Sequence, residues 1–243
     1  MYNSQKEKLL YLSILSEQCE RYKDMISYLE NLVSIKKEEL NFDERNLLSI
    51  AYKNYISEIR NAIRVIMAYE NKETTKGDSP YLIFIIEYKE KIKNELEKEC
   101  VKICNTIENK IKPKLTSKET KVFFGKMKGD YYRYIAENTE GDIKKKYSDL
   151  SLGTYNETIA ISNNLNYQNS EKLSLLLNLS VFYYEVASNP KEAFSLANQT
   201  LKKAKEALKG IDEDNEEYKD SLSIVNLLHD NIEMWEMETQ DLD

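Results

Sequence analysis

Glycine and proline, the residues that most often interrupt helices, are scarce in this chain: there are six and three of them among 243 residues. Leucine, lysine, glutamate, isoleucine and asparagine are abundant, and 41% of the residues are hydrophobic. A chain of this length and composition can bury a substantial core. Because it is rich in helix formers and poor in turn residues, long helices joined by short loops are favoured. We therefore predict an all-α fold.

Cysteine and histidine are also rare. The three cysteines, Cys19, Cys100 and Cys104, are too few for a disulfide framework, and their odd number is typical of a reducing compartment. A structural zinc site needs about four ligands, and the single histidine, His229, is far in sequence from the cysteines. We expect Cys100 and Cys104 to be small buried side chains, and we expect neither a metal nor another cofactor.

Positive charge is not in excess, since the formal net charge is −7. Proteins that bind nucleic acid or an anionic membrane need a basic face, so neither class is expected, and any anion site must be local. The longest apolar run, residues 81–86, is far shorter than the about 20 residues that span a bilayer. The charged start of the chain shows no signal peptide. We predict a cytoplasmic protein without membrane insertion.

Motifs that would indicate an enzyme are missing as well. The sequence has no neighbouring Cys–His pair, no glycine loop that would cradle a phosphate and no carboxylate–histidine metal motif. We therefore predict that the protein is not an enzyme. Residues 181–193 are similar to part of a tetratricopeptide unit, but a period of about 34 residues is not repeated along the chain.

Hydrophobic spacing and capping residues predict about nine helices in one antiparallel bundle. Their approximate ranges are 4–16, 19–35, 41 or 43 to 71, 79–110, 121–136, 141–163, 169–187, 189–210 and 215–237. Pro80 is expected in a first helical turn and Gly210 at a helix end. No linker marks a boundary, so we predict a single domain over residues 1–237, followed by a short acidic tail over residues 238–243.

A basic stripe runs along the third predicted helix. Lys53, Arg60 and Arg64 are spaced i, i+7, i+11, which places them within about 40° of one another around the helix axis. Such a stripe is either an anion-binding face or an ordinary solvated face, and Glu58 on the polar side keeps the second interpretation open.

The fifth predicted helix combines an aromatic face with a charged one. Arg133 and Tyr134 together offer a guanidinium fork and a phenolic hydroxyl, a pair suited to a tetrahedral anion. The alternative is a structural arginine that pairs with a carboxylate such as Asp130. The apolar side carries Phe123, Met127 and Tyr131.

Two asparagines stand inside otherwise apolar stripes of the seventh and ninth predicted helices. They are Asn178 and Asn231. A buried carboxamide must find partners, and it can bond the N–H and C=O groups of an extended peptide at once. It can equally tie two helices together, and spacing alone does not separate these interpretations.

Four segments of the chain resemble the signature blocks of the 14-3-3 family. They are RNLLSIAYKN (45–54), KVFFGKMKGDYYRY (121–134), NLSVFYYE (178–185) and residues 218–235. They occur in the order of the family, at nearly its spacing, and span nearly the whole chain. The resemblance implies a nine-helix bundle with a concave amphipathic groove. It also implies an adaptor that binds phosphoserine or phosphothreonine segments of client proteins in signalling, as a homodimer or as a heterodimer with a paralogue.

The resemblance also implies roles for individual residues. The phosphate would be bound by Lys53, Arg60, Arg133 and Tyr134, and the peptide backbone by Asn178 and Asn231. The groove wall would comprise Leu177, Val181, Ile224, Leu227, Met234 and Trp235. The cations would be oriented by Arg64, Asp130 and Glu185. The dimer interface would include Leu15, Arg21, Asp24, Tyr88, Lys91 and Glu95.

The chain departs from the family pattern at several positions. Ile59 stands where relatives usually have an arginine, Ile63 where they have a tryptophan, and Ala62 where many have a serine whose phosphorylation loosens the dimer. Residues 81–86 are apolar where the family is normally polar, so we expect a changed contact surface there. The alternative function is a phosphate-independent, helical-repeat-like scaffold for unphosphorylated peptides or tails. It would be indifferent to phosphate.

Overall fold

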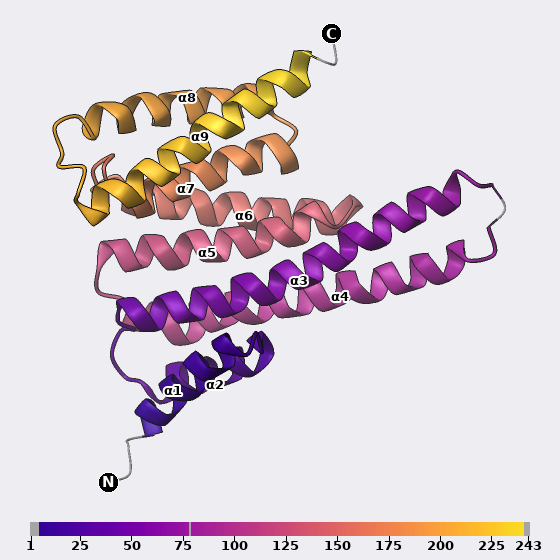
Figure 1. Ribbon diagram of the computed structural model, residues 1–243, viewed down its shortest axis with the longest axis horizontal. Helices are drawn as coiled ribbons and strands as arrows, with labels where there is room; N and C mark the ends of the chain where they lie inside the picture. The colour runs from indigo at the N-terminus through magenta and orange to yellow at the C-terminus, as the bar shows by residue number, and fades with distance from the viewer. Residues whose placement is uncertain (1–4, 78, 241–243) are drawn as a thin grey trace. The chain divides into compact units, whose positions relative to one another are not determined.

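The computed structural model describes residues 5–77 and 79–240, with the side chain of residue 240 excepted. Over these residues the chain forms nine α-helices and no β-strand, which confirms the predicted all-α class (Figure 1). The fold divides into two compact units, the first ending at Leu115 and the second beginning at Thr116. The single domain over 1–237 stays a prediction. Of the predicted acidic tail, residues 238–240 belong to the last helix, and 241–243 lie outside the described residues.

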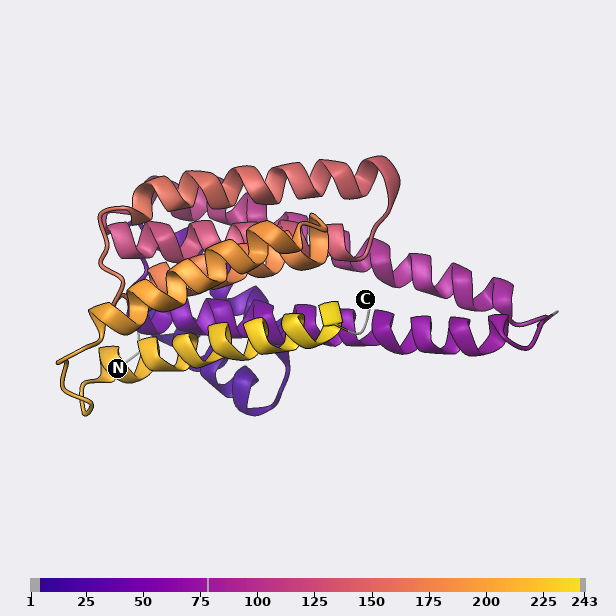
Figure 2. The ribbon, with the colours of Figure 1, turned by 90° about the horizontal axis from the view of Figure 1, so that it is seen from above.

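The N-terminal unit consists of two short and two long helices. They are α1 (Gln5–Gln18), α2 (Tyr22–Ile35), α3 (Phe42–Thr74) and α4 (Leu82–Thr106), followed by a π-helical turn (Ile107–Ile111) and a 3-10 turn (Lys112–Lys114). α1 packs on α2, α2 packs on α3, and α3 pairs with α4 in an antiparallel hairpin (Figures 1 and 2). The 33 residues of α3 correspond to about 50 Å at 1.5 Å per residue.

Local sequence explains where α3 begins. The Asn41 side chain accepts a hydrogen bond from the backbone N–H of Glu44, and the Glu44 carboxylate accepts one from the backbone N–H of Asn41. This capping box satisfies two backbone donors at the helix start. Glu44 also forms a buried ion pair with Lys36. The apolar side of α3 then fills the core of the unit with Leu48, Tyr52, Ile56 and Ile63.

The C-terminal unit contains five helices. They are α5 (Lys118–Glu137), α6 (Gly141–Ser162), α7 (Ser170–Val181), α8 (Pro190–Ala207) and α9 (Glu216–Gln240), with a π-helical turn (Phe182–Val186) after α7. α5 and α6 approach closely because α5 carries glycine at the contact: a Cβ on Gly129 would lie 2.6 Å from the ring of Tyr155. α7, α8 and α9 share a core that includes Leu177, Ala197, Leu228 and Trp235.

Several helix boundaries were predicted wrongly. α2 begins at Tyr22 rather than residue 19, because Glu20 has a positive φ of 54° and breaks the helix. Pro80 precedes α4 instead of occupying its first turn. α8 ends at Ala207, and Gly210, with φ 79°, lies in the turn that follows.

In two further helices the regular α-helix ends before the residue that the sequence predicted. α4 ends at Thr106 and α7 at Val181, and both continue as π-helical turns. No helix in the described part of the chain combines the length and the apolar character needed to cross a lipid bilayer.

Candidate functional site

The basic stripe of α3 lies on the outward side of that helix. Lys53 and Arg64 are exposed and Arg60 is half-buried. Ile59 and Ile63, two of the positions that depart from the family pattern, are buried. The two isoleucines therefore contribute to the core of the N-terminal unit, and the stripe remains a separate cationic face.

On α5 the guanidinium of Arg133 is buried, with 6% of the residue exposed. Its Nη1 donates a hydrogen bond to Glu137 Oε1 at 2.5 Å, and two other carboxylates, of Asp130 and Glu185, lie 3.8 Å from its Nη2 and Nη1 atoms. The ring of Tyr134 lies 4.8 Å from the guanidinium carbon. Glu137 was not predicted, although its i+4 spacing on the same helix is the signal that could have identified it.

Arg133 remains cationic in this setting. Burial alone lowers its pKa, but interactions with Tyr155, Glu137, Tyr134 and Asp130 outweigh burial and raise the pKa well above the ordinary value. Arg133 therefore does pair with carboxylates, as the structural interpretation of this residue predicts. It does not exclude anion binding, because an arginine has five N–H donors.

A hydrogen-bond network joins Arg133 to Asn178 through Asp130. The hydroxyl of Tyr155 donates to Asp130 Oδ1 at 2.5 Å and accepts a long hydrogen bond from Arg133 Nε at 3.4 Å. The amide nitrogen of Asn178 donates to both oxygens of Asp130, at 2.8 and 2.9 Å. Burial, followed by the charge of Asp130, raises the pKa of Tyr155 well above its usual value, so the phenol keeps the proton that it donates.

Tyr155 is a residue that sequence reasoning missed. It lies on α6, far in sequence from Arg133, and no motif marks it. Its position follows from the close approach of α5 and α6 at Gly129, where the glycine leaves room for its ring. A glycine opposite a tyrosine on a neighbouring helix is a tertiary signal, and it could not be recognised before the helix pairing was known.

The residues predicted to form an apolar wall differ in exposure. Leu227 and Met234 on α9 are exposed, and Val181 and Ile224 are half-buried. Leu177 and Trp235 are buried, and the Trp235 ring stacks on the ring of Tyr184 at 4.6 Å between centroids. Leu177 and Trp235 therefore support this surface from beneath, while the exposed side chains form its apolar part. Asn231 is half-buried on the same helix.

Three of the four charged residues predicted for a dimer interface pair with charged groups of the same chain. Arg21 pairs with Asp24 at 2.5 Å, and Glu95 lies 3.4 Å from Lys23 and accepts a hydrogen bond from the Tyr55 hydroxyl at 2.9 Å. Leu15, Tyr88 and Lys91 are exposed. A cavity of about 430 Å³ lies beside these groups, and its lining includes Arg21, Asp24, Ile59, Ala62, Ile92 and Glu95.

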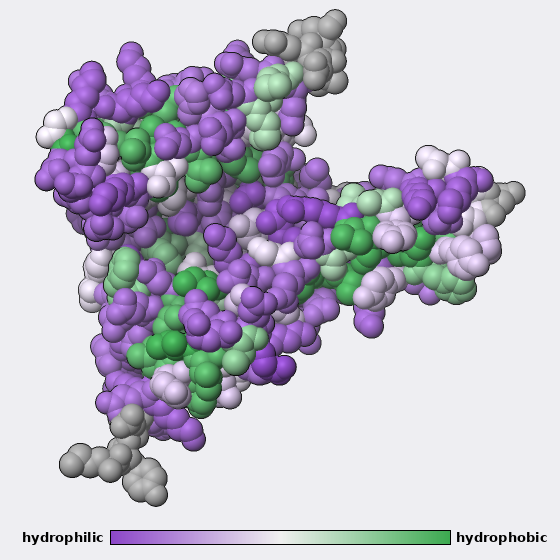
Figure 3. Space-filling view, viewed as in Figure 1, coloured by the Kyte–Doolittle hydropathy of each residue, from purple (hydrophilic) through white to green (hydrophobic). Residues whose placement is uncertain are grey.

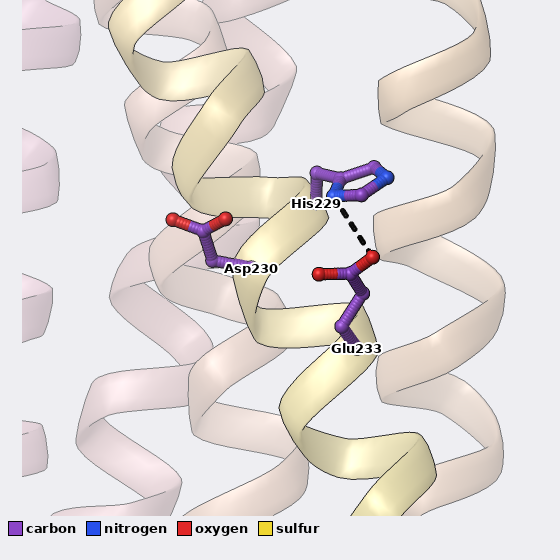
Figure 4. Close-up of side chains that lie close together, drawn as sticks. All are labelled: His229, Asp230 and Glu233. Atoms are coloured by element: carbon purple, nitrogen blue, oxygen red, sulfur yellow. Dashed lines mark ion pairs between the residues drawn. The ribbon is translucent and has the colours of Figure 1, made fainter.

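One cluster of potential metal ligands occurs among the described residues. His229, Asp230 and Glu233 on α9 have ligand atoms within 4.8 Å of one another, and all three residues are exposed. Figure 4 shows His229 and Glu233 directed toward each other, with 3.6 Å between Nδ1 and Oε1. A contact between exposed side chains one helical turn apart accounts for this arrangement.

Over the described residues the chain is thus an all-α protein with a basic stripe on α3 and a buried arginine next to a tyrosine on α5. Comparison with known proteins then identifies the family. The 14-3-3 protein family profile matches residues 12–236. 14-3-3 protein 10 of Solanum lycopersicum is 39% identical over 98% of this chain and 95% of its own length.

Two relatives from other organisms are similar to the same extent. 14-3-3 protein 2 of Entamoeba histolytica is 39% identical over 97% of this chain and 98% of its own length. The checkpoint signal transducer rad25 of Schizosaccharomyces pombe is 40% identical over 99% and 88%. The chain belongs to the 14-3-3 family. It is a dimer-forming adaptor that binds phosphorylated client proteins in signalling.

Proposed function

We propose that phosphoserine or phosphothreonine in a client segment is bound by Lys53 and Arg60 of α3 and by Arg133 and Tyr134 of α5. The observation that carries this proposal is the buried, fully charged Arg133. Its Nη2 atom is 3.8 Å from Asp130, which is longer than a hydrogen bond. A phosphate oxygen would offer Nη2 a shorter, charge-assisted contact.

Asn178 is proposed to hold the backbone of the client peptide. Because its amide nitrogen donates to Asp130, its carbonyl oxygen remains an acceptor for a peptide N–H. Asn231 is assigned the same role on α9, next to the exposed side chains of Leu227 and Met234. Asp130 would thus orient both Arg133 and Asn178, and Glu185 and Arg64 are proposed to help orient the phosphate-binding cations.

Replacing Tyr155 with phenylalanine tests the orienting network. The variant keeps the ring but removes the hydroxyl, so Asp130 loses a donor and Arg133 an acceptor. We expect affinity for a phosphoserine peptide to fall up to about tenfold and the free energy of unfolding to fall by about 1–3 kcal/mol. Peptide titration and urea denaturation measure the two effects.

The matched control for this variant is Tyr147→Phe, a buried tyrosine on the same helix. It should leave phosphopeptide affinity within about twofold of wild type, whatever its effect on stability. Equal losses of affinity in both variants would show that stability alone, and not the position of Arg133, is being measured.

The affinity for a phosphoserine peptide should depend on pH because the phosphate of the peptide changes its charge. The second pKa of a phosphate monoester is about 6, so the dianion is lost as pH falls through that value. Arg133 stays charged and Tyr155 stays neutral because both pKa values are raised. We expect affinity for a phosphoserine peptide to be highest near pH 8 and to weaken below pH 6, as measured by fluorescence titration from pH 5 to pH 8.

The unphosphorylated twin of the peptide and the variant His229→Gln are the controls for this experiment. Histidine commonly changes charge in this range, and His229 is the only one in the chain. The variant should keep the wild-type profile. A flat profile between pH 5 and pH 8 would argue against a dianionic ligand and would favour the phosphate-independent scaffold, which family membership does not support.

We also propose a cytoplasmic location. The support for it is that the three cysteines are all free thiols, as expected in a reducing compartment. Imaging of the tagged protein together with a cytoplasmic marker tests this proposal, and accumulation in a secretory compartment would contradict it.

A further inference from the structure

Two lysines converge on one tyrosine in the C-terminal unit. Tyr167 lies in the connection between α6 and α7, Lys172 in the first turn of α7, and Lys203 on α8. The ammonium group of Lys172 lies 4.2 Å from the centre of the Tyr167 ring, and that of Lys203 lies 5.1 Å from it. Lys203 also donates a hydrogen bond to the Tyr167 hydroxyl at 3.3 Å. These three residues are called the lysine–tyrosine cluster.

The connection that carries Tyr167 is held in place by the helices around it. The Ser221 hydroxyl of α9 donates a hydrogen bond to the backbone oxygen of Gln168 at 2.5 Å. The Tyr167 ring packs against a small apolar core where α7, α8 and α9 meet. The buried members of this core are Leu173, Ala204, Leu208 and Val225. The ring therefore has a defined position, and the two lysines approach it from two different helices.

Neither lysine of the cluster is neutralised by a carboxylate. Lys172 is only 6% exposed, and its ammonium group donates one hydrogen bond, to the backbone oxygen of Leu165 at 2.8 Å. Among residues 5–77 and 79–240, no carboxylate forms an ion pair with Lys172 or Lys203. Buried lysines are rare unless they are paired, because an uncompensated buried charge is costly. The cluster thus has two positive charges and lacks a counter-charge.

The position of Lys172 is unfavourable for a cation in two further respects. Burial lowers the pKa of Lys172; the interaction with Tyr167 opposes this effect, and the nearby charge of Lys203 lowers the pKa further. Lys172 also lies in the first turn of α7, where the helix dipole favours negative charge. An anion between the two ammonium groups would remove the repulsion and would be favoured by the dipole.

We propose that the lysine–tyrosine cluster binds a phosphate dianion, either as inorganic phosphate or as the phosphoryl group of a monoester. The two ammonium groups have free N–H donors, and the Tyr167 hydroxyl accepts from Lys203 and keeps its own proton to donate. A phosphate has about −1.5 to −2 charges at neutral pH and three acceptor oxygens, which matches two cations and a hydroxyl. A carboxylate has one charge, so it would leave the second lysine uncompensated.

The cluster is separate from the phosphopeptide contacts of Arg133, and the proposal goes beyond the proposed function. The Asn169 side chain, which caps α7, donates a hydrogen bond to Glu119 in the first turn of α5 at 3.3 Å. From residue 119 to Arg133 the helix rises about 21 Å. In Figure 1 the connection of α8 and α9 lies at one end of the unit, and Figure 3 shows mostly hydrophilic side chains over that end.

A titration with inorganic phosphate tests the site directly. The protein is labelled with ¹³C at the lysine ε-carbons and followed by NMR at pH 7.5 and constant ionic strength. We expect the signals of Lys172 and Lys203 to shift together, with half-saturation below about 10 mM phosphate. Phosphate should also raise the pKa of Lys172, because a bound anion favours the charged form. Signals that stay unmoved, or that chloride moves as far at equal ionic strength, would overturn the proposal.

Replacing Lys203 with methionine removes one of the two charges. Lys203 is exposed, so the fold should be retained, and phosphate binding read out at Lys172 should weaken at least about tenfold. Lys202→Met is the matched control, because Lys202 is also exposed but points about 100° away around α8. The control should bind phosphate within about twofold of wild type. Equal weakening by both variants would overturn the assignment of the cluster.

A comparison of two ligands identifies the source of the phosphate. Phosphoserine with blocked termini and inorganic phosphate are titrated separately against the same lysine signals. Tighter binding of the blocked phosphoserine would support a monoester ligand, and tighter binding of inorganic phosphate would support the free ion. Binding of neither ligand at the cluster would overturn the proposal.

Phosphopeptide affinity separates this proposal from the proposed function. An equimolar phosphoserine peptide should bind Lys203→Met as tightly as wild type, because the cluster is distant from Arg133 along α5. Unmoved cluster signals together with tight phosphopeptide binding would overturn the cluster site and leave the adaptor function intact. Cluster signals that respond to phosphate in a protein that binds no phosphopeptide would support the cluster site and contradict the proposed function.

Discussion

Replacing Arg133 with lysine is expected to weaken phosphoserine-peptide binding about 100-fold. A loss of this size is what the removal of a hydrogen bond between charged groups costs. Lysine keeps the positive charge but not the planar fork. It cannot donate at once to Glu137, to Tyr155 and to a phosphate oxygen in the observed directions. The peptide titration should show this loss for the phosphorylated peptide alone.

Lys145→Ala is the control for a change of net charge. This lysine is exposed on α6, and its removal should change the affinity less than about twofold. Urea denaturation of Arg133→Lys shows how far the carboxylates around position 133 are disturbed. If the lysine variant bound the phosphopeptide as tightly as wild type, charge alone would be sufficient, and the fork geometry described for Arg133 would have no role in recognition.

A peptide with two phosphoserines joined by a long flexible linker should bind the dimer at least about 100-fold more tightly than a peptide with one. After the first site is bound, the second is presented at an effective concentration in the millimolar range. The gain requires two grooves in one particle, so it depends on dimerisation and on a linker that can span them. Competition titrations of the two peptides against one fluorescent ligand measure it.

The wild-type protein, diluted below its dimer dissociation constant, serves as the monomeric control for this gain. It should bind the doubly and singly phosphorylated peptides with affinities that differ only by the statistical factor of about two. Equal affinities for a demonstrated wild-type dimer, over a series of linker lengths, would contradict the expectation that one dimer engages two phosphorylated sites at once.

Much of the helical architecture could be predicted from the sequence because its signals are local. The Asn41 cap with Glu44 three residues later, and the apolar spacing of α3, follow from neighbouring residues alone. Boundaries failed where backbone conformation is set by a turn, as at Glu20, whose positive φ is unusual for a residue with a side chain. The π-helical turns after α4 and α7 have no simple sequence signature.

In the candidate site, too, some features follow from neighbouring residues and others depend on how the helices pack. The fork and hydroxyl of Arg133 and Tyr134 are adjacent in sequence, and their suitability for a phosphate follows from their chemistry. The orienting contacts of Asp130 with Tyr155 and Asn178 depend on which helices pack together, so they appear only in the structure. The burial of Trp235 likewise depends on packing, in this case against Tyr184. The family resemblance predicted only that Trp235 belongs to the groove wall.

The measurement that tests the central claim most directly is a titration of a fluorescent phosphoserine peptide and its unphosphorylated twin, with wild type and with Arg60→Ala. Arg60 is half-buried on the outward side of α3, so its replacement should leave the fold intact. We predict tight wild-type binding only of the phosphorylated peptide, weakened about tenfold or more by Arg60→Ala. Equal binding of both peptides, or a phosphopeptide affinity unaffected by Arg60→Ala, would contradict recognition of phosphate by the α3 stripe.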